Sequence, residues 1–201
     1  TLDPDIFPAA NRRMIQVLRL PACTLITGAS VTPDGLAKRL EGWSGSQCLL
    51  RCPELDDAAY QVLASSSVPA SRSAGCPLLL HGAPERLALV PDADGLHLPW
   101  REARALMERP ASRAYRLGVS CHGRASLEHA KRLGADYAFL SPVRPTASHP
   151  DRLPLGWDGF EALVTDLDLP VYALGGVGGD DVAQSRRHGG CGIAGIGFWW
   201  H

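Results

Sequence analysis

Residues 171–197 read VYALGGVGGDDVAQSRRHGGCGIAGIG, and this stretch decides the fold. Its two ends, residues 171–174 and 192–196, are short apolar runs that are typical of buried strands, and each runs into glycines. Residues 180–188 between them are expected to form a helix. A strand, a helix and a second strand in this order predict a right-handed βαβ unit with two parallel strands.

The same alternation runs back to about residue 23. The predicted strands are residues 24–27, 47–51, 78–80, 95–98, 115–120, 137–140, 171–174 and 192–196, and the predicted helices between them cover residues 32–40, 54–64, 84–89, 101–108, 126–133, 157–164 and 180–188. Eight such units close a barrel, whereas six favour an open doubly wound sheet. The sequence therefore predicts an α/β protein with one compact domain, a (β/α)8 TIM barrel, over residues 23–201. Residues 1–22 are expected to be an N-terminal linker or docking helix.

Composition narrows the class of protein. The chain has 201 residues, of which 45% are apolar, and its net charge is −1, which suits one globular domain and does not favour nucleic acid or a membrane as a partner. No apolar stretch approaches a membrane span and no signal-peptide pattern is present, so we expect a cytoplasmic protein. Six cysteines occur without a CxxC pair, which indicates buried free thiols in a reducing compartment.

Two glycine clusters mark a candidate phosphate site. Residues 175–179 read GGVGG after the seventh strand, and residues 195–197 read GIG after the eighth. In barrels of this architecture the functional residues lie at the carboxyl ends of the strands, and phosphate is bound by the loops after strands seven and eight. Glycines allow a close approach of the backbone, and a helix N-terminus directs N–H groups at an anion. The alternative is that these glycines only form tight turns.

Three histidines and a serine fall near other strand ends. His81 follows the third strand, His97 lies in the fourth, and Ser120 and His122 end the fifth. A histidine there could transfer protons, because its ordinary pKa lies near neutrality. His97 sits among apolar residues and is expected to be a core histidine. A metal shared by His81 and His122 has no supporting ligand spacing. The long polar loop 141–149 is expected to be a lid or a ligand contact, or else a solvated linker.

An ordered set of motifs resembles the thiamine phosphate synthase/TenI superfamily. The motifs are Leu25-Ile26-Thr27, Asp94-Gly95-Leu96-His97-Leu98, Gly118-x-Ser120-x-His122, Gly134-Ala135-Asp136-Tyr137, Ser141-Pro142-x-x-x-Thr146, Ala173-x-Gly175-Gly176 and Gly192-Ile193-Ala194-Gly195. The resemblance covers residues 23–198. It implies that a thiazole phosphate is the small-molecule ligand, with Gly175, Gly176, Gly195 and Ile196 at the phosphate and Thr146, Ser148, Ser120, Arg51 and His81 lining the site.

The second half of the family pattern is altered. Thiamine phosphate synthases also bind a pyrimidine diphosphate with magnesium, through a Gln-x-Arg-x-Lys motif that here reads Leu49, Arg51 and Pro53. Their Asn-Asp after strand three reads His81-Gly82, their Gly-Gln-x-Asp after strand four reads residues 99–102, PWRE, and their late lysine is His149. Diphosphate with magnesium needs cationic and carboxylate groups, so these changes argue against the synthase reaction.

The resemblance is therefore interpreted as closest to the TenI-like branch. TenI-type proteins aromatise a carboxythiazole phosphate tautomer without a cofactor, and they use a histidine at the position of His122 as the acid and base. We expect an isomerase of this kind rather than a transferase, with no metal. The alternatives are a thiamine phosphate synthase, which would need magnesium, and a non-catalytic module that binds a phosphate of the thiamine pathway.

The start of the chain carries a further resemblance. Residues 7–11, FPAAN, leading to Leu20-Pro21 look like the segment that joins a MutT-type Nudix hydrolase to a TenI-like domain in fused bacterial proteins. This resemblance implies that residues 1–22 are the remnant of a preceding Nudix domain, and it makes a covalently attached Nudix domain a candidate partner. The Nudix box itself is absent from the sequence. Family resemblance also suggests a homodimer.

Overall fold

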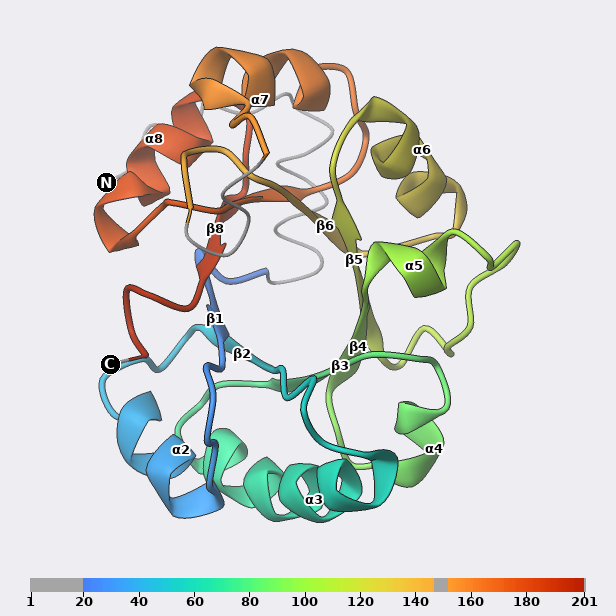
Figure 1. Cartoon of the computed structure of the whole chain (residues 1–201), viewed down its shortest axis with the longest axis vertical. Coiled ribbons are helices and arrows are strands. Elements are labelled where there is room, and N and C mark those ends of the chain that lie inside the picture. Colours follow the sequence, from blue (N-terminus) through green and yellow to red (C-terminus); the bar gives the residue numbers. More distant parts are fainter. Residues whose placement is uncertain (1–19, 147–151, 201) are drawn as a thin grey trace.

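Eight parallel strands close into a barrel in the computed structural model, which describes residues 20–146 and 152–200. Each strand pairs with the next in chain order, and β8 pairs with β1 to close the ring (Figure 1). The strands are β1 (Cys23–Ile26), β2 (Gln47–Leu50), β3 (Leu78–His81), β4 (Gly95–Leu98), β5 (Arg116–Cys121), β6 (Tyr137–Leu140), β7 (Val171–Leu174) and β8 (Gly192–Gly195). The predicted (β/α)8 barrel is confirmed. Residues 1–19 lie outside the described residues, so the linker or docking helix predicted over 1–22 stays a prediction.

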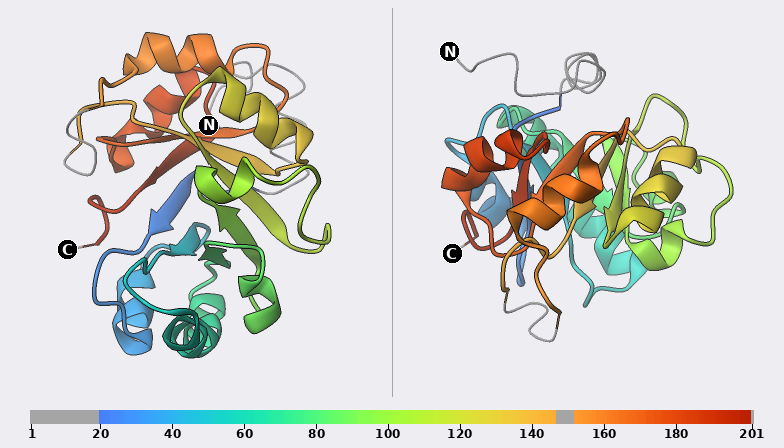
Figure 2. Two further views of the ribbon diagram at one scale, coloured as in Figure 1. Left: turned by 45° about the vertical axis from the view of Figure 1, so that its right-hand side comes forward. Right: turned by 90° about the horizontal axis from the view of Figure 1, so that it is seen from above.

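The helices surround the strands on the outside of the barrel, as the two views of Figure 2 show. They are α2 (Pro33–Leu40), α3 (Asp57–Ser73), α4 (Arg86–Leu89), α5 (Trp100–Ala103), α6 (Arg124–Arg132), α7 (Gly156–Val164) and α8 (Val182–Arg187), with a 3-10 turn, η2 (Gly179–Asp181), before α8. Helix α2 begins as predicted, because the Thr32 side chain accepts a hydrogen bond from the Gly35 amide at 3.1 Å. A barrel fits into this short chain because α4 and α5 are single turns.

Two helices differ from their predicted lengths. The prediction of a helix over 101–108 is wrong, because α5 ends at Ala103. Conversely, α3 continues to Ser73, beyond the end predicted at residue 64, and it carries Pro69 in its interior. An interior proline removes a helical hydrogen bond. The helix persists because Ala64, Val68 and Ser71 are buried against the barrel. Packing of this face outweighs local propensity.

The core has two shells. The outer shell lies between the strands and the helices, and it contains most of the buried leucines together with Tyr60 and Phe160. The inner shell fills the barrel and consists of Leu20, Ile26, Leu49, Leu79, Tyr137, Phe139, Tyr172, Cys191 and Ala194. Filling by side chains from successive strands is what this architecture requires, so the barrel is a packed core and no channel passes through it.

A buried ion pair stabilises the barrel at the amino ends of its strands. The Asp136 carboxylate accepts hydrogen bonds from the Leu117 amide at 2.7 Å and from the Arg109 guanidinium at 2.9 Å. The side chains of Arg109 and Asp136 are only 10% and 12% exposed. At this end of a barrel such contacts contribute to stability and not to ligand binding.

All six cysteines are free, five of them buried and Cys23 partly buried, as the absence of a CxxC pair predicted. In the part of the chain that the structure describes, the helices are too short or too polar for any of them to cross a membrane.

Candidate functional site

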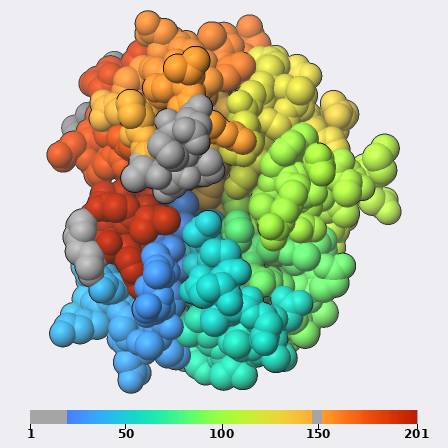
Figure 3. All heavy atoms as spheres, in the orientation of Figure 1, coloured from blue at the N-terminus to red at the C-terminus, as the bar shows by residue number. Residues whose placement is uncertain are grey.

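A cavity of about 510 Å³ opens at the carboxyl ends of the strands. Figure 3 views the molecule from this end, where the segments after β1, β2 and β8 (blue, cyan and red) meet near the centre of the face. The predicted site residues within the described range all line it: Arg51, His81, Ser120, His122, Thr146, Gly175, Gly176, Gly195 and Ile196. Ser148, also predicted, lies outside the described residues, as does His149. Cavities of roughly 300–1,000 Å³ are the ordinary size for small-molecule ligands.

Backbone amides line the part of the cavity formed by β7 and β8. Gly175 and Gly176 have φ angles of +93° and +66°, a region that favours glycine. A Cβ on Gly176 would lie 2.5 Å from the Pro145 carbonyl oxygen, so no larger residue fits without moving the loop after β6. Within the described residues no acceptor is recorded for the amides of Gly176, Val177, Ile196 and Gly197. Unpaired N–H groups beside a cavity are suited to an anion.

The helix after the glycines contributes less than the sequence suggested. The predicted helix over 180–188 is broken into η2 and the short α8, and the Asp181 carboxylate already accepts the Gly178 amide at 2.9 Å. The same carboxylate pairs with Arg144 at 2.9 Å. The expectation that a helix N-terminus serves as the anion site is therefore wrong, because a carboxylate occupies that place. The loop amides remain as the donors.

His122 lies at the wall of the cavity just after β5. Its main-chain amide donates to the Ser126 hydroxyl at 3.0 Å, and its Nδ1 lies 3.1 Å from the Ser141 carbonyl oxygen. A carbonyl oxygen only accepts, so Nδ1 carries the proton in this contact and fixes the orientation of the ring. The same geometry directs the second ring nitrogen away from that carbonyl.

Ser120 is the exposed end of a buried hydrogen-bonded chain. Its hydroxyl lies 2.8 Å from His97 Nε2, and His97 Nδ1 lies 3.0 Å from the Tyr137 hydroxyl. His97 is fully buried, and both of its ring nitrogens have partners, so the prediction of a core histidine is confirmed. Burial and the neighbouring His81 hold the pKa of His97 well below its usual value, so the ring is neutral. Room for this ring depends on Gly118, where a Cβ would lie 2.4 Å from His97 Nδ1.

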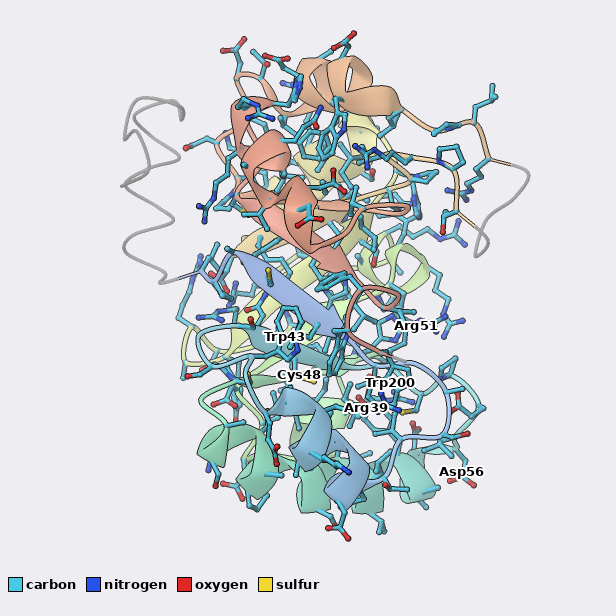
Figure 4. All side chains as sticks on the ribbon, turned by 90° about the vertical axis from the view of Figure 1, so that its left-hand side faces the viewer. Arg39, Trp43, Cys48, Arg51, Asp56 and Trp200 are labelled. Atoms are coloured by element: carbon cyan, nitrogen blue, oxygen red, sulfur yellow. The ribbon has the colours of Figure 1, made fainter. Side chains whose placement is uncertain are left out.

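Arg51 and His81 lie at the ends of β2 and β3. The buried Thr27 hydroxyl bonds both the amide (2.8 Å) and the carbonyl (3.0 Å) of Arg51, which fixes the backbone while the side chain stays exposed. Figure 4 labels Arg51, which follows β2, together with Cys48, which lies within that strand. The His81 amide donates to the Tyr60 hydroxyl at 3.0 Å. Burial, together with the charges of Arg51 and Arg86, lowers the pKa of His81 to about 4.

Sequence reasoning missed part of the apolar floor, whereas it had met residue 49 and residues 99–102 as altered positions of the synthase motifs. The floor includes Leu49, Phe139 and Ala194, and the wall includes Trp100 and Arg101. The floor residues belong to strands, and their side chains face the interior of the barrel. Strand alternation would have found them if the register had been known. Trp100 is held edge-on against His129, with ring centroids 5.5 Å apart.

Magnesium, which the family resemblance implies for a synthase, does not fit this cavity. Mg²⁺ is bound through carboxylate oxygens and water. Among the described residues no Asp or Glu side chain lines the cavity, whereas Arg51 and Arg101 do. Nor do three His, Cys, Asp or Glu side chains gather anywhere in residues 20–146 and 152–200 in a way that could hold a metal ion. A cation would meet positive charge here without a neutralising ligand.

The fold and the cavity define a class, a (β/α)8 barrel with a ligand site at the carboxyl ends of its strands. The family model described as "Thiamine monophosphate synthase" matches residues 24–197. The chain therefore belongs to this family, which is the superfamily that its motifs resemble. The resemblance to domains fused to Nudix hydrolases stays a prediction.

Relatives within the family carry the name of one activity. The "Thiamine-phosphate synthase" of Herpetosiphon aurantiacus is 34% identical over 73% of this chain and 69% of the relative. The protein of the same name from Chloroflexus aurantiacus is 34% identical over 62% of this chain and 57% of the relative. Across three of the most similar relatives the match spans between 52% and 59% of their length. A synthase of this kind is a transferase, so the preference for an isomerase over a transferase was wrong.

A solved structure confirms the fold. Thiamine phosphate pyrophosphorylase from Pyrococcus furiosus superposes with a TM-score of 0.70 at 21% identity, and the match covers 87% of this chain and 84% of the other. The altered diphosphate motif misled the sequence interpretation, because it was weighed more heavily than the ordered barrel motifs that the relatives share.

Proposed function

We propose that the chain is a transferase of the thiamine phosphate synthase type, which joins a pyrimidine methyl diphosphate to a thiazole phosphate. The observation that carries the proposal is that two sets of anion-binding groups face one cavity. Loop amides after β7 and β8 form one set, and Arg51, Arg101 and His122 supply the other. A substrate pair with a phosphate on one partner and a diphosphate on the other matches this arrangement, and family membership supports the same pair.

In this reaction the thiazole nitrogen forms a bond to the methylene carbon of the pyrimidine. The bond from that carbon to the diphosphate oxygen breaks, and the diphosphate leaves with the electron pair. The residues of this chain bind and orient the partners: the loop amides hold the thiazole phosphate, the apolar floor packs under the rings, and arginines stabilise the charge of the leaving diphosphate. His122 keeps its Nδ1–H on the Ser141 carbonyl and is proposed to donate a hydrogen bond to a phosphate oxygen from Nε2 when the ring is an imidazolium with a proton on each nitrogen.

The test is product formation from both substrates, followed by chromatography and mass detection, in parallel with Mg²⁺ and with EDTA. We expect thiamine phosphate and pyrophosphate in equal amounts. His122→Gln should lower the rate at least tenfold, whereas His188→Gln should leave it unchanged, because His188 is a partly buried histidine that pairs with Glu161 at 2.9 Å and does not line the cavity. No product under either condition would exclude the transferase.

Among the described residues no carboxylate lies along the cavity wall, and this favours a second candidate, a module that binds a thiamine-pathway phosphate without turnover. Its signature is saturable binding of thiazole phosphate with no product in the same assay.

A further inference from the structure

The part of the cavity next to β2, β3 and β4 has an unusual charge balance. Arg51 follows β2, His81 ends β3, and Trp100 and Arg101 follow β4, and all four side chains line the cavity. The charges of both arginines act on the His81 ring and contribute to the low pKa of that group, which places them near one another. This region therefore carries positive charge, and within residues 20–146 and 152–200 no lining carboxylate offsets it.

The Arg51 guanidinium is available to a ligand. Within residues 20–146 and 152–200 it makes no recorded hydrogen bond or ion pair, although its backbone is fixed by the buried Thr27. Arg86 is close by but is already engaged, because it lies 3.7 Å from the centroid of the Tyr60 ring and donates to the His81 carbonyl. A fixed backbone with an uncommitted guanidinium is what direct recognition of a phosphate group requires.

Arg101 can exchange its present partner for a ligand with little loss of interaction energy. It pairs with Glu102 at 3.1 Å, and its side chain is 77% exposed, so the pair is surrounded by water. Exposed pairs of this kind contribute little to stability, less than a bond between arginine and a desolvated phosphate. Trp100, the neighbouring residue, also lines the cavity.

We propose that Arg51 and Arg101 bind the diphosphate directly and take the place of a divalent cation in this chain. That this diphosphate is the leaving group of a reaction rests on the function proposed above. A diphosphate has enough oxygens for both guanidiniums, and two arginine charges replace those of one Mg²⁺. The geometry of guanidinium groups suits phosphoryl oxygens, and their charge does not depend on pH in the neutral range.

Titration calorimetry with inorganic pyrophosphate on the full chain tests this proposal. Binding in EDTA should be at least as tight as binding in excess Mg²⁺, since the metal only competes for the free anion. Arg51→Gln and Arg101→Gln should each weaken binding in EDTA about tenfold or more, because a bond to a charged group is worth roughly 1.5–3 kcal/mol. Arg104→Gln removes the same charge from an exposed residue that does not line the cavity, and it should bind like wild type.

In calorimetry the proposal is overturned by binding that requires Mg²⁺, by no binding at all, or by equal loss in the Arg104→Gln control. Thermal unfolding of each variant separates loss of the site from loss of the fold, and the exposed positions of both arginines predict unchanged midpoints. Binding of inorganic pyrophosphate involves no group transfer, so this test is independent of the transferase reaction. If pyrophosphate binds as described but no thiamine phosphate forms, the transferase fails and the metal-free anion site stands. If transfer occurs only with Mg²⁺, the metal-free site fails and the transferase stands.

Discussion

Acidification should destabilise this protein through two histidines at pH values where most carboxylates are still ionised. His97 is fully buried, and its pKa lies well below the ordinary value because of burial and His81. Burial and nearby arginines lower the pKa of His81 to about 4. Both rings gain a proton near pH 6.5 in the unfolded chain but stay neutral in the folded one. The unfolded state therefore binds more protons, and the free energy of unfolding falls as pH drops from 6.5 toward 4.

The magnitude follows from the ordinary histidine pKa. Each ring that stays neutral costs about 1.4 kcal/mol per pH unit below 6.5, so one histidine costs about 2 kcal/mol between pH 7 and pH 5 and the two together about 4 kcal/mol. Urea unfolding at both pH values measures this change directly. His81→Gln removes one titrating ring. The free energy of unfolding of this variant should therefore fall between pH 7 and pH 5 by about half as much as that of wild type.

A wild-type protein equally stable at pH 7 and pH 5 would refute the reasoning. A His81→Gln variant whose free energy of unfolding falls as much as that of wild type would contradict it too, because the fall would then come from other groups.

Three substitutions test separate parts of the structure. Gly118→Ala should destabilise the fold by about 1–3 kcal/mol or more in urea unfolding, because its Cβ would overlap the interior rings, whereas Gly179→Ala, with open space around it, should have little effect. Gly176→Ala should leave the fold in place but weaken binding of thiazole phosphate at least tenfold in calorimetry, because its loop must shift; unchanged affinity would contradict the amide site. Asp136→Ala should cost about 3–5 kcal/mol by leaving the Arg109 charge buried and unpaired, with no effect on ligand affinity once the protein is folded.

The order of elements could be predicted from the sequence because a βαβ barrel repeats a local pattern. The β7 strand, Val171–Leu174, was placed correctly because its apolar run ends in glycines. The length of α3 could not be found in this way. Its last turns contain Pro69 and several serines, and their helical state depends on contacts with a barrel that a local pattern does not contain.

The candidate site was likewise predicted only in part. The strand-end rule and the family motifs named His122 and the glycines, because these residues stand directly after strands. The wall at Trp100 and Arg101, which the sequence interpretation met as an altered synthase motif, belongs to a one-turn helix whose sequence suggested an ordinary longer one. The contact of the Asp181 carboxylate with the Gly178 amide, at the start of η2, was missed, since it depends on the exact residue at which the turn begins.

The most direct test of the central claim is amide NMR during titration with thiazole phosphate. The claim is that loops after β7 and β8 bind the phosphate through the backbone amides of Gly176, Val177, Ile196 and Gly197. We predict that these amide signals shift together and saturate with one dissociation constant, while the signal of Gly42, in an exposed turn, stays in place. Saturable shifts that centre on other residues, or no shift at these four amides, would contradict the account.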